Sequence, residues 1–333
     1  MTIRAAVIGL GHMGRNHARV LSNGVGGVEL VAAMDTQGDR FGVARQVPVV
    51  ATVDELLEQG IDYAVVSVPT FAHEDIAVRL ADAGVHALIE KPLAPSAESA
   101  HHIRQAFEGS GLVAGVGHVE RFNPALRQMR SRIAQGEIGA VFQISTRRQG
   151  PFPARIADVG VVADLAAHDI DLTAWLTDSH YVSVSAHTAH KSGREHEDLI
   201  AGIGMLANGV VTNHLVNWLS PQKERSTIVL GEKGMLVADT LTADLTLHRN
   251  GTIESEWDAL GVFRGVSEGD SIRYAFPKPE PLLVEHETMR DAIIGKPADI
   301  VGLQEATRTV VVVEAMLESA RTDRTVDLTG AMV

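Results

Sequence analysis

The segment DLAAHDIDL, residues 164–172, places three aspartates and one histidine among leucine, isoleucine and alanine. On a helix, Asp164 and His168 are four residues apart and share one face. Leucines at helical spacing lie close to that face, so the pair is expected at the edge of an apolar surface, partly screened from water. A histidine in such a place can act as a base near neutral pH, tuned by the adjacent carboxylate. The pair is therefore our candidate for proton transfer.

Two other interpretations of this pair remain open at the level of sequence. The histidine could be a core residue that is hydrogen-bonded by its own helix neighbour. Aspartate and histidine are also both metal ligands, although we predict no metal site in this chain. Of the two remaining acids, Asp171 should project near the pair, and Asp169 should fall on the other side of the leucines. Either can bind substrate or simply form hydrogen bonds, and Asp169 is kept as a substrate-binding candidate.

Composition limits the classes of protein to consider. The chain has 333 residues, enough for about two domains of roughly 150 residues each. A net charge of −13 argues against a nucleic-acid partner. The absence of cysteine excludes disulfides, a thiolate nucleophile and cysteine metal sites, and it fits a reducing compartment. The N-terminal apolar run is too short for a signal peptide, and no apolar stretch reaches about 18 residues. We therefore expect a cytoplasmic protein with no membrane partner.

The pattern of apolar residues changes near residue 120. Before it, short apolar runs alternate with amphipathic stretches, which indicates a parallel sheet covered on both sides in a doubly wound α/β domain. These runs cover residues 3–10, 28–35, 62–69, 85–92 and 112–119. After it, longer runs alternate polar and apolar residues, as in an antiparallel sheet with one solvated face. We predict a Rossmann domain over 1–120 and an α+β substrate-binding and oligomerisation domain over 121–333. A helix near 303–320 can pack either within this second domain or back against the first domain.

The motif GLGHMG, residues 9–14, matches G-x-G-x-x-G between a predicted strand and a predicted helix. Gly9 would make the tight turn, Gly11 would let the backbone approach a pyrophosphate, and Gly14 would let the helix lie close to the strand. The helix N-terminus would then offer N–H groups to the phosphates.

Asp35 ends the second predicted strand, 21 residues after Gly14, where an acid would meet an adenosine ribose. It could also be an ordinary surface turn residue. A carboxylate there accepts bonds from the 2′-hydroxyl and repels a 2′-phosphate, and the next arginine along the chain is Arg40. The sequence therefore favours NAD over NADP.

The motif IEKPLA, residues 89–94, places Lys91 at the C-terminal end of a predicted parallel strand, where open α/β sheets bind ligands. A lysine in such a place is usually a solvated loop residue. Together with the glycine loop and SVPTFAHEDIA at 67–77, however, the sequence resembles the Gfo/Idh/MocA oxidoreductases over essentially its full length. In that family the E-K-P lysine lies beside the nicotinamide and the substrate. Its partner is a D-x-x-x-H motif of the second domain, which matches Asp164 and His168 here.

The resemblance implies an NAD-dependent oxidoreductase in which Lys91, Asp164 and His168 are catalytic. It also places Thr70, His73 and Glu90 near the cofactor. With the glycine loop, the expected cofactor-binding residues are Gly9, Gly11, His12, Met13, Gly14, Asp35, Pro69, Thr70, His73, Glu90 and Lys91.

The substrate class is suggested by two stretches, residues 115–129 and 217–239. Both look like the family branch that acts at C3 of nucleotide-linked sugars, such as UDP-N-acetylglucosamine 3-dehydrogenases, and less like the inositol dehydrogenase branch. Arginine forms forked bonds to phosphate oxygens, and the alternative for each of these arginines is a surface residue or an intramolecular salt bridge. The expected substrate-binding residues are Arg121, Asn123, Arg147, Arg148 and Asp169.

The leading interpretation is a dehydrogenase of a UDP-linked sugar. The alternatives are a dehydrogenase of a free sugar or cyclitol, a reductase of a 3-keto sugar, and a non-catalytic dinucleotide-binding sensor on the same fold. The resemblance also implies a homodimer or homotetramer that pairs through the exposed sheet of the second domain.

Overall fold

The computed structural model describes residues 2–44, 47–153, 159–251 and 269–330. Internal contacts divide the chain into two compact units. Unit 1 comprises Met1–Phe122 and Pro279–Val311, and unit 2 comprises Asn123–Lys278 and Val312–Val333. Within the described residues, no helix is both long and apolar enough to cross a bilayer.

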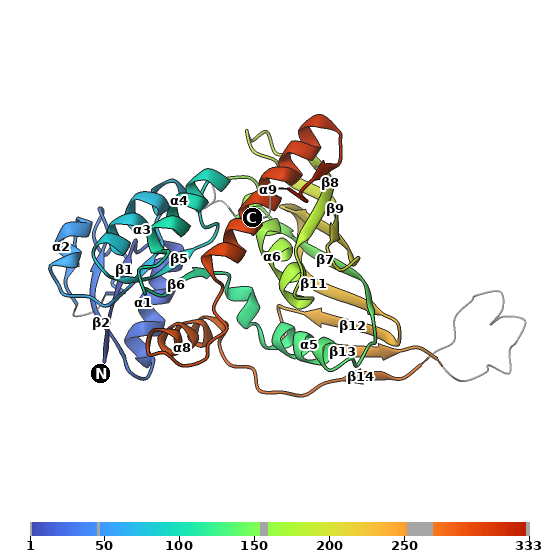
Figure 1. The fold of residues 1–333 in the computed structure, drawn as a ribbon, viewed down its shortest axis with the longest axis horizontal. Helices are drawn as coiled ribbons and strands as arrows, with labels where there is room; N and C mark the ends of the chain where they lie inside the picture. The colour runs from blue at the N-terminus through green and yellow to red at the C-terminus, as the bar shows by residue number, and fades with distance from the viewer. Residues whose placement is uncertain (1, 45–46, 154–158, 252–268, 331–333) are drawn as a thin grey trace, which may run out of the picture. The chain divides into compact units, whose positions relative to one another are not determined.

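Unit 1 contains a six-stranded sheet in the order β3-β2-β1-β4-β5-β6, and each neighbouring pair of strands is parallel (Figure 1). The order reverses between β1 and β4, which is where ligands bind in doubly wound sheets. The strands are β1 (Ile3–Ile8), β2 (Val28–Met34), β3 (Val49–Val50), β4 (Tyr63–Val66), β5 (His86–Glu90) and β6 (Ala114–Gly117). The helices are α1 (His12–Gly24), α2 (Val53–Leu57), α3 (His73–Asp82), α4 (Ala97–Phe107), α8 (Pro281–Ile293) and the start of α9 (Leu303–Thr322), with short 3₁₀ turns η1 (Thr70–Ala72) and η2 (Val119–Phe122).

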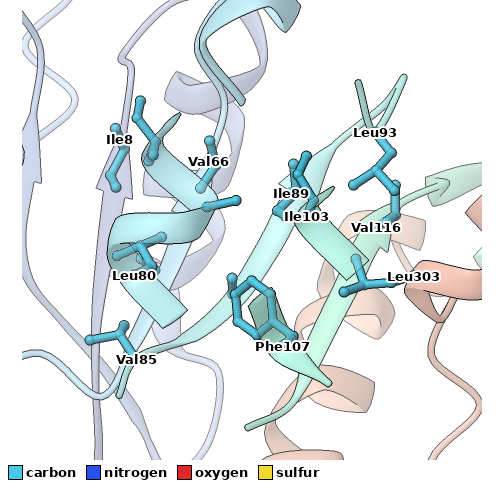
Figure 2. Close-up of a cluster of buried hydrophobic side chains, with 14 of the residues drawn as sticks. Ile8, Val66, Leu80, Val85, Ile89, Leu93, Ile103, Phe107, Val116 and Leu303 are labelled. Carbon is cyan, nitrogen blue, oxygen red and sulfur yellow. The ribbon is translucent and has the colours of Figure 1, made fainter. Parts of the chain in front are cut away.

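Successive side chains of each strand in this sheet enter two different cores. Ala6 and Ile8 of β1 join the core beneath α2, α3 and α4, whereas Ala5 and Val7 join the core beneath α1 and α8. Figure 2 shows the first core, in which side chains of several strands meet Leu80 of α3 together with residues of α4 and α9. The strands are apolar on both faces because helices cover both sides of the sheet.

Helix α8 belongs to unit 1, whereas the sequence placed 121–333 in the second domain and allowed only the helix near 303–320 to pack back on the first. Leu282 and Met289 of α8 are buried in the same core as α1. Just before α9, the Val301 carbonyl accepts a hydrogen bond from the Val116 N–H (2.9 Å), which adds a short contact to the edge of β6. These contacts join residues far apart in sequence, so the local pattern contains no sign of them.

Unit 2 contains a nine-stranded sheet in the order β14-β13-β12-β11-β7-β10-β9-β8-β15. All neighbours are antiparallel except β10 and β7. The strands are β7 (Val141–Pro151), β8 (Tyr181–Ala189), β9 (Leu199–Leu206), β10 (Val211–Asn217), β11 (Leu219–Gly231), β12 (Gly234–Asp239), β13 (Asp244–Arg249), β14 (Ser271–Arg273) and β15 (Val326–Asp327). Its helical segments are α5 (Pro124–Ala134), the π-helical turn η3 (Val162–Ala166), α6 (Ala167–Leu176) and the second part of α9.

Among the described residues, the helical segments of unit 2 cover one face of its sheet. Along β9, side chains alternate between buried and exposed from Ile200 to Leu206, and η3 contacts β9 and β10 on the buried side. The predicted fold class is therefore confirmed: a parallel Rossmann sheet is followed by a mainly antiparallel α+β part.

Candidate active site

The glycine loop lies where the strand order of unit 1 reverses. Gly9 has φ +85°, a conformation that favours glycine, and its N–H donates to the Met34 carbonyl at 2.7 Å. A Cβ on Gly14 would lie 1.7 Å from the carbonyl oxygen of Gly9 and 2.6 Å from Oγ of Ser67. Only a glycine at position 14 therefore lets α1 begin so close to β1.

The start of α1 has the features of a phosphate site. Gly11 precedes the helix, no side chain caps it, and a Cβ there would meet no atom within 4 Å. The first N–H groups of a helix have no partner within the helix and favour an anion. Contacts within the protein therefore do not require glycine at position 11, and the open space there fits a closely approaching pyrophosphate.

Asp35 follows β2 and lies against the glycine loop. Its Oδ2 accepts the Leu10 N–H and its Oδ1 accepts the Gln37 N–H, both at 2.8 Å. Carboxylate oxygens accept more than one hydrogen bond, so the fixed carboxylate retains capacity for ribose hydroxyls. These residues fit the adenosine half of NAD, which would supply the nicotinamide as hydride acceptor.

We predict that NAD(H) binds at least about tenfold more tightly than NADP(H), a difference of about 1.4 kcal/mol. The carboxylate of Asp35 should repel the 2′-phosphate, whereas the guanidinium groups of Arg15 and Arg40 lie over the Phe41 ring, 5.1 and 5.9 Å from its centroid. Titration calorimetry with both cofactors measures the preference. Asp35→Ser should reduce it, and an equal or stronger affinity of the unmutated protein for NADP(H) would refute it.

His73 connects the two loops that follow β4 and β5. Its Nε2 lies 3.0 Å from the Val68 carbonyl, and its Nδ1 lies 3.1 Å from the Pro92 carbonyl and 3.2 Å from that of Leu93. Burial lowers the pKa of His73 below its usual value, although the carbonyls oppose this effect. The structure therefore gives His73 a role in fixing loop geometry. Thr70 lies one turn earlier, in η1 after Pro69.

Lys91 directly follows β5, and the Lys91–Pro92 peptide bond is cis. The Lys91 N–H donates to Oε2 of Glu90 at 3.0 Å, and Oε1 of Glu90 lies 2.9 Å from Nε2 of His17. Burial alone would raise the pKa of Glu90, but the His17 hydrogen bond and the nearby Lys91 charge hold it below its usual value. Glu90 is therefore a fixed, buried carboxylate that is hydrogen-bonded to the backbone of Lys91.

In unit 2, Asp164 lies in the π-helical turn η3 and His168 lies in α6. The sequence predicted one continuous α-helix, so the four-residue spacing includes a wider turn than expected. Asp164 is 8% exposed, and His168 is half-buried. π-Helical turns occur often at functional sites, because they alter which side chains share a face.

The buried Glu197 explains where this turn begins. Its Oε1 accepts the Val162 N–H at 3.0 Å, and its carbonyl accepts the Val161 N–H at 3.1 Å. A Cβ on Gly160 would lie 1.9 Å from Oε1, so glycine leaves the space for this carboxylate. Neither Glu197 nor Gly160 could be selected from the sequence, because their contact spans 37 residues.

Helix α6 is held to the sheet by two sets of polar contacts. Asp169 forms a buried ion pair with Arg148 of β7 (Nε–Oδ1 2.8 Å). Thr173 lies 2.5 Å from the hydroxyl of Tyr181, which lies 2.8 Å from Nε2 of His214. Burial lowers the pKa of His214 to about 4, so this ring is neutral at neutral pH. These contacts fix the orientation of α6 and hence of His168.

The predicted substrate-binding residues all have partners within the protein. Arg121 contacts both carboxylate oxygens of Glu305 at 3.3 Å, and the half-exposed Arg147 lies 3.5 Å from Glu224. Asn123 caps α5 by accepting the Ala125 N–H (3.0 Å), and it donates to the Thr240 carbonyl (3.0 Å). Arg148 and Asp169 pair with each other. Substrate binding by these residues stays a prediction.

Two family models match successive parts of the chain. The model described as "Oxidoreductase family, NAD-binding Rossmann fold" matches residues 3–118, and the GFO/IDH/MocA C-terminal domain model matches residues 126–237.

Curated relatives include two dehydrogenases with different substrates in their names. Scyllo-inositol 2-dehydrogenase (NAD(+)) from Bacillus subtilis is 34% identical over 56% of this chain and 57% of its own length. UDP-N-acetylglucosamine 3-dehydrogenase from Acidithiobacillus ferrooxidans is 30% identical over 75% of this chain and 78% of its own length. The chain thus spans little more than half the length of the first and over three quarters of the second.

Solved structures extend the likeness to nearly the whole chain. The structure of the Acidithiobacillus ferrooxidans enzyme is 25% identical, covers 97% of this chain and 98% of its own, and superimposes with a TM-score of 0.85. Levoglucosan dehydrogenase in complex with NADH, at 17% identity and a TM-score of 0.84, has the same fold. With both family models matched and a 30% identical relative covered over 78% of its length, the chain belongs to the Gfo/Idh/MocA family of oxidoreductases, whose N-terminal domain is an NAD-binding Rossmann fold.

Proposed function

We propose that the protein is an NAD-dependent dehydrogenase that transfers a hydride between nicotinamide and a secondary hydroxyl, at C3, of a UDP-linked sugar. The observation that carries the cofactor half of this proposal is the glycine turn of unit 1, in which position 14 admits no side chain and position 11 has no packing reason to be glycine. The sugar half is supported by the UDP-N-acetylglucosamine 3-dehydrogenase relative, in sequence and in fold.

In the proposed reaction, each unit contributes a different group. The glycine turn and Asp35 of unit 1 would hold NAD, and the bound nicotinamide would supply the hydride acceptor for the carbon that bears the hydroxyl. His168 takes the hydroxyl proton, and Asp164 orients the ring and stabilises its charged form. Lys91 donates a hydrogen bond to the same oxygen and stabilises its developing negative charge. In the reverse direction the same groups reduce a 3-keto sugar.

A second candidate, dehydrogenation of a free cyclitol, is favoured by the scyllo-inositol 2-dehydrogenase relative, which is slightly more identical but covers less of the chain. The two candidates differ in what binds outside the reacting carbon. A nucleotide can contribute binding energy remote from the reaction and use it for orientation, whereas a cyclitol cannot.

A panel of UDP-sugars, free sugars and inositols, each with NAD, is expected to separate these candidates. NADH should form with a UDP-linked hexose derivative, and the matching free sugar should be a much poorer substrate. Faster turnover of inositol or a free aldose than of every nucleotide sugar would replace the proposal by the cyclitol candidate. No turnover in either direction, with NAD bound, would favour a non-catalytic sensor.

A further inference from the structure

A chain of buried polar side chains continues behind Glu90 into the core of unit 1. Nδ1 of His17, on α1, lies 2.9 Å from Nε2 of His286, on α8. Nδ1 of His286 lies 3.2 Å from the hydroxyl of Tyr63, on β4. All three side chains are at most 1% exposed. Such a chain is costly to bury unless each hydrogen bond is satisfied, so it calls for an explanation beyond packing.

The direction of each hydrogen bond in this series of side chains follows from its last member, Glu90. Glu90, held ionised, can only accept, so Nε2 of His17 must carry a hydrogen. If His17 is neutral, its Nδ1 accepts, and Nε2 of His286 must donate. A neutral His286 then accepts at Nδ1 from the Tyr63 hydroxyl. All three bonds are satisfied with no charge on either ring, and each donor points toward Glu90.

The opposite assignment leaves a buried donor unsatisfied. A doubly protonated His17 would donate to Nε2 of His286, and His286 would donate from Nδ1 to the oxygen of Tyr63. The Tyr63 hydrogen would then need another acceptor, and among the described residues the Tyr63 hydroxyl forms no hydrogen bond besides the one to His286. An unsatisfied buried donor is strongly disfavoured. Burial lowers the pKa of His286 well below its usual value, and a charged His17 would lower it further, so that ring stays neutral in either case.

Glu285, the remaining acid of this cluster, does not compete with Glu90. Its side chain is buried, and its two oxygens have no hydrogen-bond partner among the described residues. Burial, with the charge of Glu90 adding to it, raises the pKa of Glu285 well above its usual value. The cluster thus holds one negative charge, on Glu90, next to Lys91.

We propose that Tyr63, His286 and His17 form a one-way hydrogen-bond relay that ends on Glu90 and positions Lys91 for the reaction. The inference rests on the proposed role of Lys91 in hydride transfer. The relay fixes one oxygen of Glu90, and the other oxygen fixes the Lys91 N–H. The three residues are positioning residues, because they act on the reacting atoms only through Glu90 and Lys91.

The direct test is the protonation of the two rings, which does not depend on activity. In protein labelled with ring-¹⁵N histidine at neutral pH, NMR should show that His17 and His286 both carry hydrogen on Nε2 and none on Nδ1. Spectra of His17→Gln and His286→Gln assign the signals. A doubly protonated His17, or a hydrogen on Nδ1 of either ring, would overturn the relay whatever the enzyme does.

Kinetics test whether the relay matters to Lys91. Glutamine at position 17 offers an N–H donor group and a carbonyl acceptor on separate atoms, as the two nitrogens of a neutral imidazole do, whereas leucine offers neither. His17→Gln should keep kcat within about threefold, and His17→Leu should lose about tenfold or more, with KM for NAD nearly unchanged. Equal losses in both variants would contradict the proposed polarity.

If the leucine variant does not fold, Tyr63→Phe serves instead, because it removes only the first donor of the relay. It should lower kcat about fivefold. It should also let part of the His286 population carry its hydrogen on Nδ1 in place of Nε2. Tyr181→Phe is the matched control, since it also removes a buried hydroxyl bonded to a histidine, but in unit 2. It should leave the spectra of His17 and His286 unchanged.

An unchanged kcat and spectrum in Tyr63→Phe would overturn the relay. Full activity of Lys91→Ala with both rings protonated as described would instead contradict the proposed function.

Discussion

Replacing His168 with asparagine, or Lys91 with alanine, should lower kcat by roughly 10²-fold or more while NAD still binds. A well-placed general base contributes about 10²–10⁴-fold in rate, and a donor at a developing oxyanion contributes about 10²–10³-fold. Asparagine keeps much of the shape and polarity of histidine but cannot take a proton. Steady-state kinetics with the best substrate of the panel, together with NAD titration, measures both quantities.

The matched control is His187→Asn, because the His187 side chain is 77% exposed on β8 and should leave kcat unchanged. If His168→Asn retains more than about a third of normal kcat, His168 does not transfer the proton. His168 would then be a structural residue of α6, and the base would have to be Lys91 or a group not considered for this role.

Gly14→Ala should abolish measurable NAD binding and lower the melting temperature. The new Cβ would lie 1.7 Å from the Gly9 carbonyl oxygen, so α1 or the end of β1 must move.

Gly11→Ala separates an effect on NAD binding from an effect on folding, because its Cβ meets no protein atom within 4 Å. It should leave the melting temperature unchanged but weaken NAD binding by roughly tenfold or more, since the phosphates approach the backbone there. Unaltered NAD affinity in Gly11→Ala would mean that the pyrophosphate lies elsewhere.

The parallel sheet and the glycine turn could be predicted because their determinants are local. Apolar runs such as residues 3–10 are continuous over the length of one buried strand. The turn from Gly9 to Gly14 depends on contacts between these two glycines and with Ser67, which follows β4. The ionisable pair of the second unit was also visible from its spacing.

The remaining features depend on long-range contacts that no local pattern records. The π-helical turn at Asp164 depends on Glu197, and the hydrogen bond between His17 and His286 joins residues 269 apart in the chain. The arginines were selected for their chemistry, but whether an arginine faces a ligand or a carboxylate of the protein depends on the fold. Arg148 illustrates this, because its partner, Asp169, was selected separately as a substrate ligand.

In the proposed reaction, hydride passes directly from the sugar carbon to NAD. It is tested most directly by incubating the protein with NAD and UDP-N-acetylglucosamine that carries deuterium only at C3, and then measuring the mass of the reduced cofactor. We predict that the NADH contains one deuterium, and that the same sugar deuterated at C4 gives unlabelled NADH. Unlabelled NADH from the C3-deuterated sugar, or no NADH from this sugar while an inositol reacts, would contradict the assigned position or the assigned substrate.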